Sequence, residues 1–174
     1  MNSFLASMGG FILVLELLGV GSILALKNSA LNIDIVASLI TMPVIIALIA
    51  YVTCSKTLST LNNLVKQLNN SRVAVGWEVA YTPNARVSRV SVSSSRELSI
   101  KLLLLVLGTV GLGYPAALLI LANLADRYFE LAGCRNVIDK RTRALQPATL
   151  GLAGALLLIR IRSGIDKCLG RENG

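Results

Sequence analysis

Four long apolar blocks, separated by polar stretches, dominate the pattern of hydrophobic and polar positions along the chain. The first block, Phe4–Leu26, has about 23 residues, and a helix of that length crosses the roughly 30 Å hydrocarbon layer of a bilayer. The second block, Ile35–Cys54, is rich in Ile, Val and Ala. The short polar link 27–34 joins them, so the pattern predicts a helical hairpin whose first helix covers about 4–26.

The second helix is predicted to continue past its apolar block and to cover about 35–70. Apolar residues recur there with alternating spacings of three and four, which is typical of a heptad seam. The seam residues are Tyr51, Cys54, Leu58, Leu61, Val65 and Leu68. The extension is either an oligomerisation stalk or a face that packs on neighbouring helices of the same chain. We favour the second interpretation, because so short a seam does not make an autonomous coiled coil.

The stretch 72–97 is the part of the sequence with the alternation of a β-strand. Apolar residues alternate with small or polar ones from Val73 to Tyr81, and Thr82–Ala85 has the composition of a turn. We expect a small, basic, β-hairpin-like insertion here, which needs a partner surface because two strands alone are barely stable in water. Without such a surface, Ser91–Ser95 belongs to a flexible loop.

The third apolar block, Leu98–Leu124, contains a cluster of residues that weaken helices. These residues are Gly108, Gly111, Gly113 and Pro115. Two structures fit the block: one kinked spanning helix, which would extend over about 98–131, or a re-entrant hairpin with two short arms. The last helix is expected over about 147–168, and it reaches spanning length only if Arg160 and Arg162 extend to the headgroups.

Composition turns this pattern into a fold class. Of the 174 residues, 54% are hydrophobic and 15% are charged, and the mean hydropathy is +0.69, so the chain lacks the polar side chains that cover a water-soluble globule. The absence of histidine excludes a Ser-His-Asp triad and a histidine-ligated metal within the chain. We predict an all-α integral membrane protein: one membrane domain over 1–174, a bundle of about four transmembrane helices with amphipathic extensions.

The distribution of charge gives the expected topology. The net charge is +8, and the segment 55–101 alone carries +5, so this loop and the N-terminus are expected on the cytoplasmic side. Four spans with both ends inside is the arrangement we favour, although it would put the basic segment 125–146 outside. The re-entrant alternative keeps 55–101, 125–146 and 160–174 all on the cytoplasmic side.

Glu16 is the ionisable residue that lies deep in a predicted span. A charged carboxylate there is costly, so Glu16 is expected to be protonated or to have a partner on another helix. Its role is either proton or cation handling, or contact with another subunit, or an interhelix hydrogen bond to Ser38, Thr41 or Asn123. The sequence indicates no catalytic residues, metal site or cofactor.

Arginines and cysteines add two further expectations. Arg86, Arg89 and Arg96 lie among serines and are candidates for contact with lipid headgroups or a partner, whereas nucleic acid is not an expected partner. The three cysteines, Cys54, Cys134 and Cys168, form no CxxC pair, so we expect small apolar residues and not a disulfide framework or a zinc knuckle.

These observations favour a non-enzymatic protein, a structural or accessory subunit of a larger membrane assembly that forms homo- or hetero-oligomers. The alternative is a small oligomeric channel or transporter that uses Glu16 and the helix break Gly108–Pro115. Transporter breaks usually come in matching halves, and the match that we find for this one is only Pro43. A membrane enzyme is the least favoured function, because no cluster of polar residues at an interface supports it.

Overall fold

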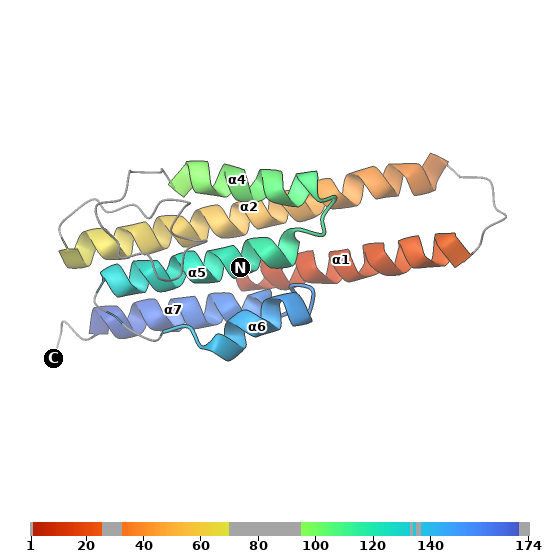
Figure 1. Cartoon of the computed structure of the whole chain (residues 1–174). Helices are drawn as coiled ribbons and strands as arrows, with labels where there is room; N and C mark the ends of the chain where they lie inside the picture. The colour runs from red at the N-terminus through yellow and green to blue at the C-terminus, as the bar shows by residue number, and fades with distance from the viewer. Residues whose placement is uncertain (1, 26–32, 70–94, 133, 135–136, 171–174) are drawn as a thin grey trace.

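The computed structural model of the chain describes residues 2–25, 33–69, 95–132, 134 and 137–170 (Figure 1). The described part is all-helical, as the sequence predicts, and contains no strand. Its helices are α1 (Asn2–Ala25), α2 (Ile33–Asn69), α4 (Ser95–Gly108), α5 (Tyr114–Leu131), α6 (Lys140–Ala148) and α7 (Gly154–Gly170).

α1 and α2 form the predicted helical hairpin, and their bounds agree closely with the predicted ones. α2 has 37 residues, which corresponds to about 55 Å, and it extends along the whole bundle (Figure 1). The seam residues Cys54, Leu58 and Leu61 are fully buried in the core of the chain itself. The interpretation of this seam as a face for packing within the chain is therefore confirmed.

The β-hairpin-like insertion predicted over 72–97 lies outside the described residues, apart from its last three positions. Those three, Ser95–Glu97, form the first turn of α4 and are helical. Arg86 and Arg89 also lie outside the described residues. Arg96 is described, and its side chain is exposed in that first turn.

The third apolar block does not form the single helix predicted over 98–131. It forms α4 and α5, which run in opposite directions and are joined by residues 109–113 (Figure 1). The last block differs in the same way, because the helix predicted over 147–168 is divided into α6 and α7 by residues 149–153. Of the two structures that the sequence allowed for the third block, the hairpin with two short arms is the one that forms.

α4 is separated from α5, and α6 from α7, because of the backbone conformation of the two joining segments. Gly111 and Gly151 have φ angles of 85° and 83°, and Val110 and Leu150 before them have φ angles of 52° and 51°. Two consecutive residues in the left-handed region end a right-handed helix. Pro115 then lies at the start of α5, where its missing N–H costs nothing.

Two of the described helices are long and apolar enough to cross a membrane, in the windows Ser3–Ser22 and Ile40–Leu64. Of the expected bundle of about four spanning helices, the described residues therefore provide two candidates. α4, with 14 residues, and α6, with 9, are too short to cross a bilayer alone.

α5 is the centre of the packing, since it contacts every other described helix. Its aromatic residues Tyr114, Tyr128 and Phe129 are fully buried. α4 packs along the middle and far part of α2, and α7 packs along the beginning of α1. α4, α5, α6 and α7 thus lie beside the later half of α2 and the first turns of α1, which begins near the middle of the bundle, and the rest of the α1–α2 hairpin extends beyond them (Figure 1).

Candidate functional site at two matching turns

Residues 109–113, which we call turn 1, satisfy their backbone N–H groups internally. The N–H groups of Thr109, Val110, Gly111 and Leu112 donate to carbonyls of the preceding turn of chain, at 2.8–3.2 Å. The N–H of Gly113 donates to the hydroxyl oxygen of Thr109 at 2.6 Å, and this hydroxyl donates to the carbonyl of Leu105 at 2.7 Å. Each N–H of turn 1 therefore has a partner without any contribution from water.

Residues 149–153, which we call turn 2, repeat this arrangement 40 positions later. The N–H groups of Thr149, Leu150, Gly151 and Leu152 again donate to nearby carbonyls, at 2.9–3.3 Å. The N–H of Ala153 donates to the hydroxyl of Thr149 at 3.1 Å, and that hydroxyl donates to the carbonyl of Leu145 at 2.7 Å. The two turns share the sequence pattern Thr-x-Gly-Leu followed by Gly or Ala.

Tyr114 joins the two turns to each other and to α1. Its side chain is fully buried, and its hydroxyl donates a hydrogen bond to the carbonyl of Ala6. Only glycine fits on either side of the ring, because a Cβ at Gly9 or at Gly151 would lie 2.7 Å from ring carbons of Tyr114. A Cβ at Gly10 would lie 2.5 Å from the backbone nitrogen of Leu152, so α1 and turn 2 are in backbone contact. Turn 1, turn 2 and α1 therefore meet at one close-packed junction.

Glu16 lies beside turn 1. A Cβ at Gly111 would lie 3.3 Å from Oε2 of Glu16 and 3.8 Å from Cδ1 of Leu13, so the carboxylate is close to the left-handed part of the turn. Oε2 is buried and has no hydrogen-bond partner within the described part of the chain. The structure thus brings Glu16 and the predicted helix break together. The expected hydrogen bond to Thr41 or Asn123 is not made by Oε2, and the Ser38 side chain lies outside the description.

The glycine and proline cluster predicted as a helix break lies in or beside turn 1. Gly108 ends α4, Gly111 and Gly113 lie within the turn, and Pro115 begins α5. Its structural match is turn 2, not Pro43, which lies inside the continuous helix α2. The sequence analysis missed turn 2, Thr109, Thr149 and Tyr114, although the repeated pattern around Thr109 and Thr149 is visible in the sequence.

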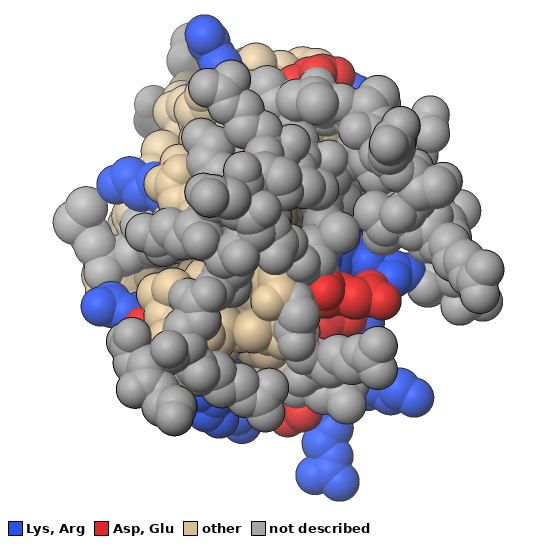
Figure 2. All heavy atoms as spheres, turned by 90° about the vertical axis from the view of Figure 1, so that its left-hand side faces the viewer, with Lys and Arg blue, Asp and Glu red and all other residues tan. Residues whose placement is uncertain are grey.

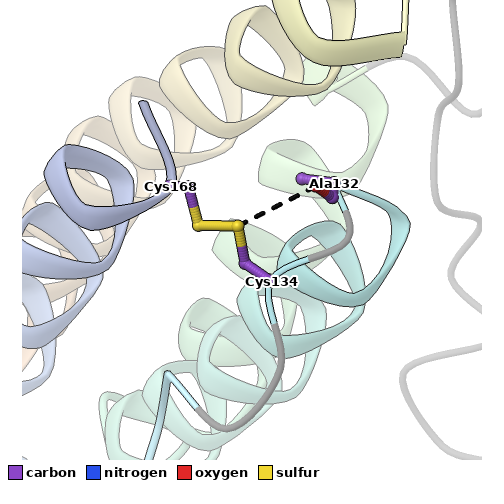
Figure 3. Close-up of a disulfide and its surroundings, with 3 residues drawn as sticks. All are labelled: Ala132, Cys134 and Cys168. Carbon is purple, nitrogen blue, oxygen red and sulfur yellow. Dashed lines mark hydrogen bonds between the residues drawn. A yellow bond between two sulfur atoms is a disulfide. The ribbon is translucent and has the colours of Figure 1, made fainter. Parts of the chain in front are cut away.

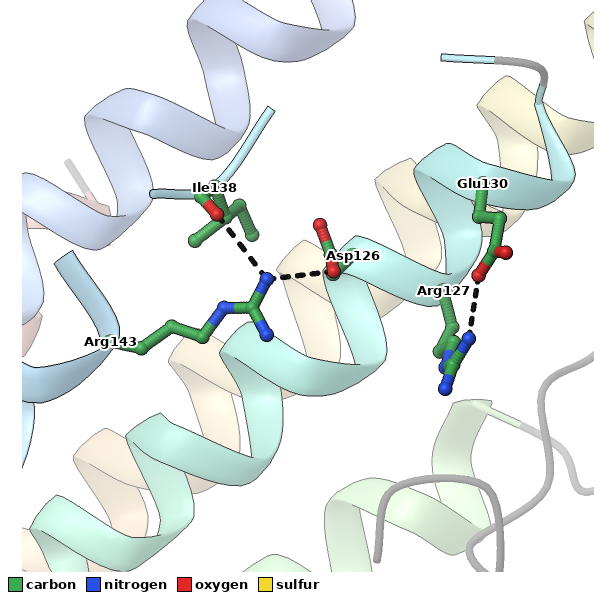
Figure 4. Close-up of polar contacts among 5 residues, drawn as sticks. All are labelled: Asp126, Arg127, Glu130, Ile138 and Arg143. Carbon is green, nitrogen blue, oxygen red and sulfur yellow. Dashed lines mark hydrogen bonds and ion pairs between the residues drawn. The ribbon is translucent and has the colours of Figure 1, made fainter. Parts of the chain in front are cut away.

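The opposite end of the bundle from the α1–α2 link carries the charged side chains. Viewed from this end, Lys and Arg side chains surround the described surface (Figure 2). Arg143 of α6 pairs with Asp126 of α5 at 2.8 Å and also donates to the carbonyl of Ile138 at 3.3 Å, which ties α6 to α5 (Figure 4). Arg127 pairs with Glu130 at 2.6 Å on the surface of α5 (Figure 4).

Two of the three cysteines are joined, which corrects the expectation of unpaired apolar residues. Cys134 and Cys168 form a disulfide that connects the end of α7 to the segment after α5 (Figure 3). The sulfur of Cys134 also lies 3.8 Å from the carbonyl oxygen of Ala132. Spacing alone does not reveal this pair, because the two residues are 34 positions apart and meet only through the folding of α7 against α5. Cys54 is free and fully buried, in agreement with its expected role as a small apolar residue.

The chain matches no protein-family model, no curated protein and no solved structure, so the function has to be argued from these contacts alone.

Proposed function

We propose that this chain is a non-enzymatic integral membrane protein that acts as a structural or accessory subunit of a membrane assembly. In this proposal α1 and α2 span the bilayer. The α4–α5 and α6–α7 hairpins enter it from the charged end and turn back inside the hydrocarbon. The proposal keeps the membrane class expected from the sequence and replaces its four spans by two spans and two re-entrant hairpins.

The observation that carries the proposal is the chemistry of the two turns. In water, the tip of a turn is usually Gly, Asn, Asp, Ser or Pro, and water satisfies part of its backbone. In hydrocarbon each unsatisfied backbone group costs several kcal/mol, so every N–H needs an internal partner. Turns 1 and 2 have internal partners for all their N–H groups and carry no charged residue.

The residues at the left-handed positions support the same conclusion. Val110 and Leu150 have positive φ angles, which for a residue with a bulky side chain costs about 1–2 kcal/mol relative to glycine. Val110 and Leu150 are 58% and 38% exposed, so neither residue lies in the core. An apolar side chain at such a strained and exposed position is favourable where the surroundings are lipid.

Apolar and charged residues are segregated along the bundle. Large hydrophobic side chains are exposed on both spans, on both turns and on the adjacent parts of α4 and α7. Exposed apolar residues on so many neighbouring elements are typical of a surface that lipid or another chain covers. The most exposed are Phe4, Phe11, Leu18, Ile40, Leu48, Leu104, Val110, Leu112, Leu156 and Ile159. Apart from Glu16, the charged side chains that the structure describes all lie on the parts of the helices away from the turns.

Contacts with α1 give the depth that the turns would reach. Turn 2 touches Gly10 and turn 1 touches Leu13 and Glu16. These residues are about 10, 15 and 20 Å along the helix from Ser3, where the apolar window of α1 begins, and the window itself is about 30 Å long. Both turns would therefore lie near the middle of the bilayer.

The charged end is proposed to face the cytoplasm, because the described Lys and Arg side chains of α4, α6 and α7 lie on this side of the turns. The N-terminus is placed on the same side, since α1 begins against α7. The disulfide between Cys134 and Cys168 provides an independent check, because disulfides persist in oxidising compartments and not in the cytosol. The disulfide and the basic residues therefore favour opposite compartments for this end, and the accessibility of Ser163→Cys from each side of intact cells distinguishes the two orientations.

Site-directed labelling in sealed vesicles tests the membrane arrangement. Leu112→Cys and Leu152→Cys place a thiol at the exposed tip of each turn, and Ser163→Cys places one on the exposed charged part of α7. We expect a membrane-impermeant maleimide to label position 163 from one side only and the turn positions from neither side. Labelling of a turn position from either side of intact vesicles would overturn the half-depth hairpins.

The structural role has its own test. Solubilisation in mild detergent is expected to release the chain as a higher-order or mixed complex, because the exposed faces of α1 and α2 are available for packing against other helices. A clean monomer after gentle extraction would contradict a role as a subunit.

A second candidate is a small oligomeric channel or transporter, and the position of Glu16 favours it. A buried carboxylate oxygen without a hydrogen-bond partner beside a broken helix is the arrangement expected of an ion or proton pathway. Proton or cation flux into liposomes would then be present for the native chain and reduced in Glu16→Gln. Equal flux in the two proteins, or none in either, excludes this function.

A further inference from the structure

The bundle has very different cross-sections on the two sides of its turns. On the side of the charged end, α4, α5, α6 and α7 lie beside α2 and the first turns of α1, which begins near the middle of the bundle (Figure 1). Beyond the turns, α1 and α2 continue without them. Among the described helices, the half with the charged end therefore contains much more helix than the other half.

This asymmetry has a direct consequence in a bilayer, if the chain inserts as proposed above. The four additional helices would occupy one leaflet only. With helix diameters of about 10 Å, they add roughly 300 Å² of cross-section to that leaflet and none to the other. A leaflet that is expanded relative to its partner becomes the convex side of a bend.

We infer that the chain is a membrane wedge: it concentrates on curved bilayers, and at high density it bends them, with the charged end on the convex face. This inference rests on the proposed membrane insertion and goes beyond it, because it assigns an activity towards lipid to a chain without indicated catalytic residues. The partner is the bilayer itself.

The hairpins have to keep their position beside α1 under the lateral pressure of the lipid. The contacts around Tyr114 hold them there. Tyr114 hydrogen-bonds to the carbonyl of Ala6, and its ring is enclosed by Gly9 and Gly151. Gly10 places α1 in direct contact with the backbone of turn 2. Both hairpins are thereby held against the rigid span α1, and the Asp126–Arg143 pair fixes α6 to α5 at the charged end.

Basic residues at the charged end hold the wedge at the membrane surface. Exposed Arg and Lys side chains occur on the outer parts of α4, α6 and α7, where the hairpins would leave the hydrocarbon. They include Arg96, Lys140, Arg141, Arg160 and Arg162. Arg and Lys at this level bind anionic headgroups, so a bilayer that contains anionic lipid is the expected substrate of the wedge.

The test uses the full chain with a fluorophore on Ser163→Cys, reconstituted into vesicles of phosphatidylcholine and phosphatidylserine with a broad range of diameters. Protein density is measured vesicle by vesicle, and an impermeant quencher identifies the molecules whose charged end faces outwards. For these molecules we expect a several-fold higher density on the smallest vesicles than on the largest. At high protein-to-lipid ratio, electron cryomicroscopy is expected to show tubules or small buds.

A variant isolates the hairpins from the spans. Leu112→Lys with Leu152→Lys adds a charge to each exposed turn tip and leaves the residues of α1 and α2 unchanged. The hairpins of this variant should leave the hydrocarbon, so its preference for small vesicles should disappear while it stays anchored. The matched control, Asp139→Asn with Asp166→Asn, raises the net charge by the same amount at exposed positions of the charged end, outside both spans, and should keep the preference.

Extraction of the vesicles with alkaline carbonate distinguishes a failure of the wedge from a failure of membrane insertion. A native chain that resists extraction but has the same density on vesicles of all diameters would overturn the wedge and leave membrane insertion intact. A chain that alkaline carbonate removes would overturn both proposals. A curvature preference that survives in the turn-tip variant would also overturn the wedge, because it would not come from the hairpins.

Discussion

Replacing Thr109 by valine removes the hydroxyl on which turn 1 depends and keeps the size and β-branching of the side chain. This hydroxyl accepts the hydrogen bond from the N–H of Gly113 at 2.6 Å and donates to the carbonyl of Leu105 at 2.7 Å. The carbonyl of Leu105 keeps a second partner in the N–H of Thr109. The N–H of Gly113 loses the partner shown for it, so the variant isolates the cost of one unsatisfied backbone donor.

The size of the effect depends on what surrounds the turn. In proteins, a buried donor without a partner costs about 1–3 kcal/mol. Transfer of an amide into hydrocarbon without a hydrogen bond costs about 4–8 kcal/mol. For a turn near the middle of a bilayer, we expect Thr109→Val to lower the free energy of unfolding by about 2–4 kcal/mol. Thr149→Val should cost less, because the corresponding bond to Ala153 is longer, at 3.1 Å.

Thr60→Val is the matched control. The Thr60 hydroxyl also donates to the carbonyl four residues earlier, at 2.9 Å, but it is exposed on α2 and no N–H is shown to depend on it. Its replacement should change stability by no more than about 0.5 kcal/mol. Reversible unfolding in lipid bicelles measures all three variants. If Thr109→Val were no more destabilising than Thr60→Val, the argument that the turns are built for a water-free environment would fail.

Three further predictions follow from the turns, the glycine contacts and the disulfide. Val110→Gly should raise the free energy of unfolding by about 0.5–1 kcal/mol, because it relieves a positive φ; an unchanged midpoint in the same bicelle assay would contradict the strain. Gly10→Ala should lower stability by about 1–3 kcal/mol, since its Cβ meets backbone at 2.5 Å, whereas Gly19→Ala, with open space around it, should be neutral or slightly stabilising. Reduction of the Cys134–Cys168 bond should cost about 2–4 kcal/mol and slow the chain on a non-reducing gel; identical mobility with and without reductant would show that the bond does not form.

The sequence was sufficient for the helical hairpin of α1 and α2, because long uninterrupted apolar runs predict helices whatever their neighbours. It also located the helix break around Gly111, since clustered glycine and proline weaken any helix. It did not decide between a kink and a hairpin, because both place the same residues at the same break. The difference depends on whether α5 finds more contact by continuing away from α4 or by turning back along α2 and α1.

The candidate site, too, could be predicted from the sequence only in part. Glu16 was recognisable as an isolated carboxylate in an apolar segment, but its proximity to Gly111 depends on how α1 packs against turn 1. Turn 2 was missed because Pro147–Ile159 looks like one short apolar block, and the Thr-x-Gly-Leu pattern has meaning only once turn 1 is seen to use its threonine as an internal hydrogen-bond partner. Cys134 and Cys168 are likewise ordinary in the sequence and meet only in the folded chain.

Local periodicity and composition were enough to locate the apolar runs and the basic segments. Which helices extend through the bundle and which turn back halfway depends on how the chain packs. That outcome depends on close contacts between distant residues, above all those of Tyr114 with Ala6, Gly9 and Gly151. Contacts of this kind need glycine on α1 and in turn 2 and tyrosine at the start of α5, and a pattern read along one of these segments contains no information about the other two.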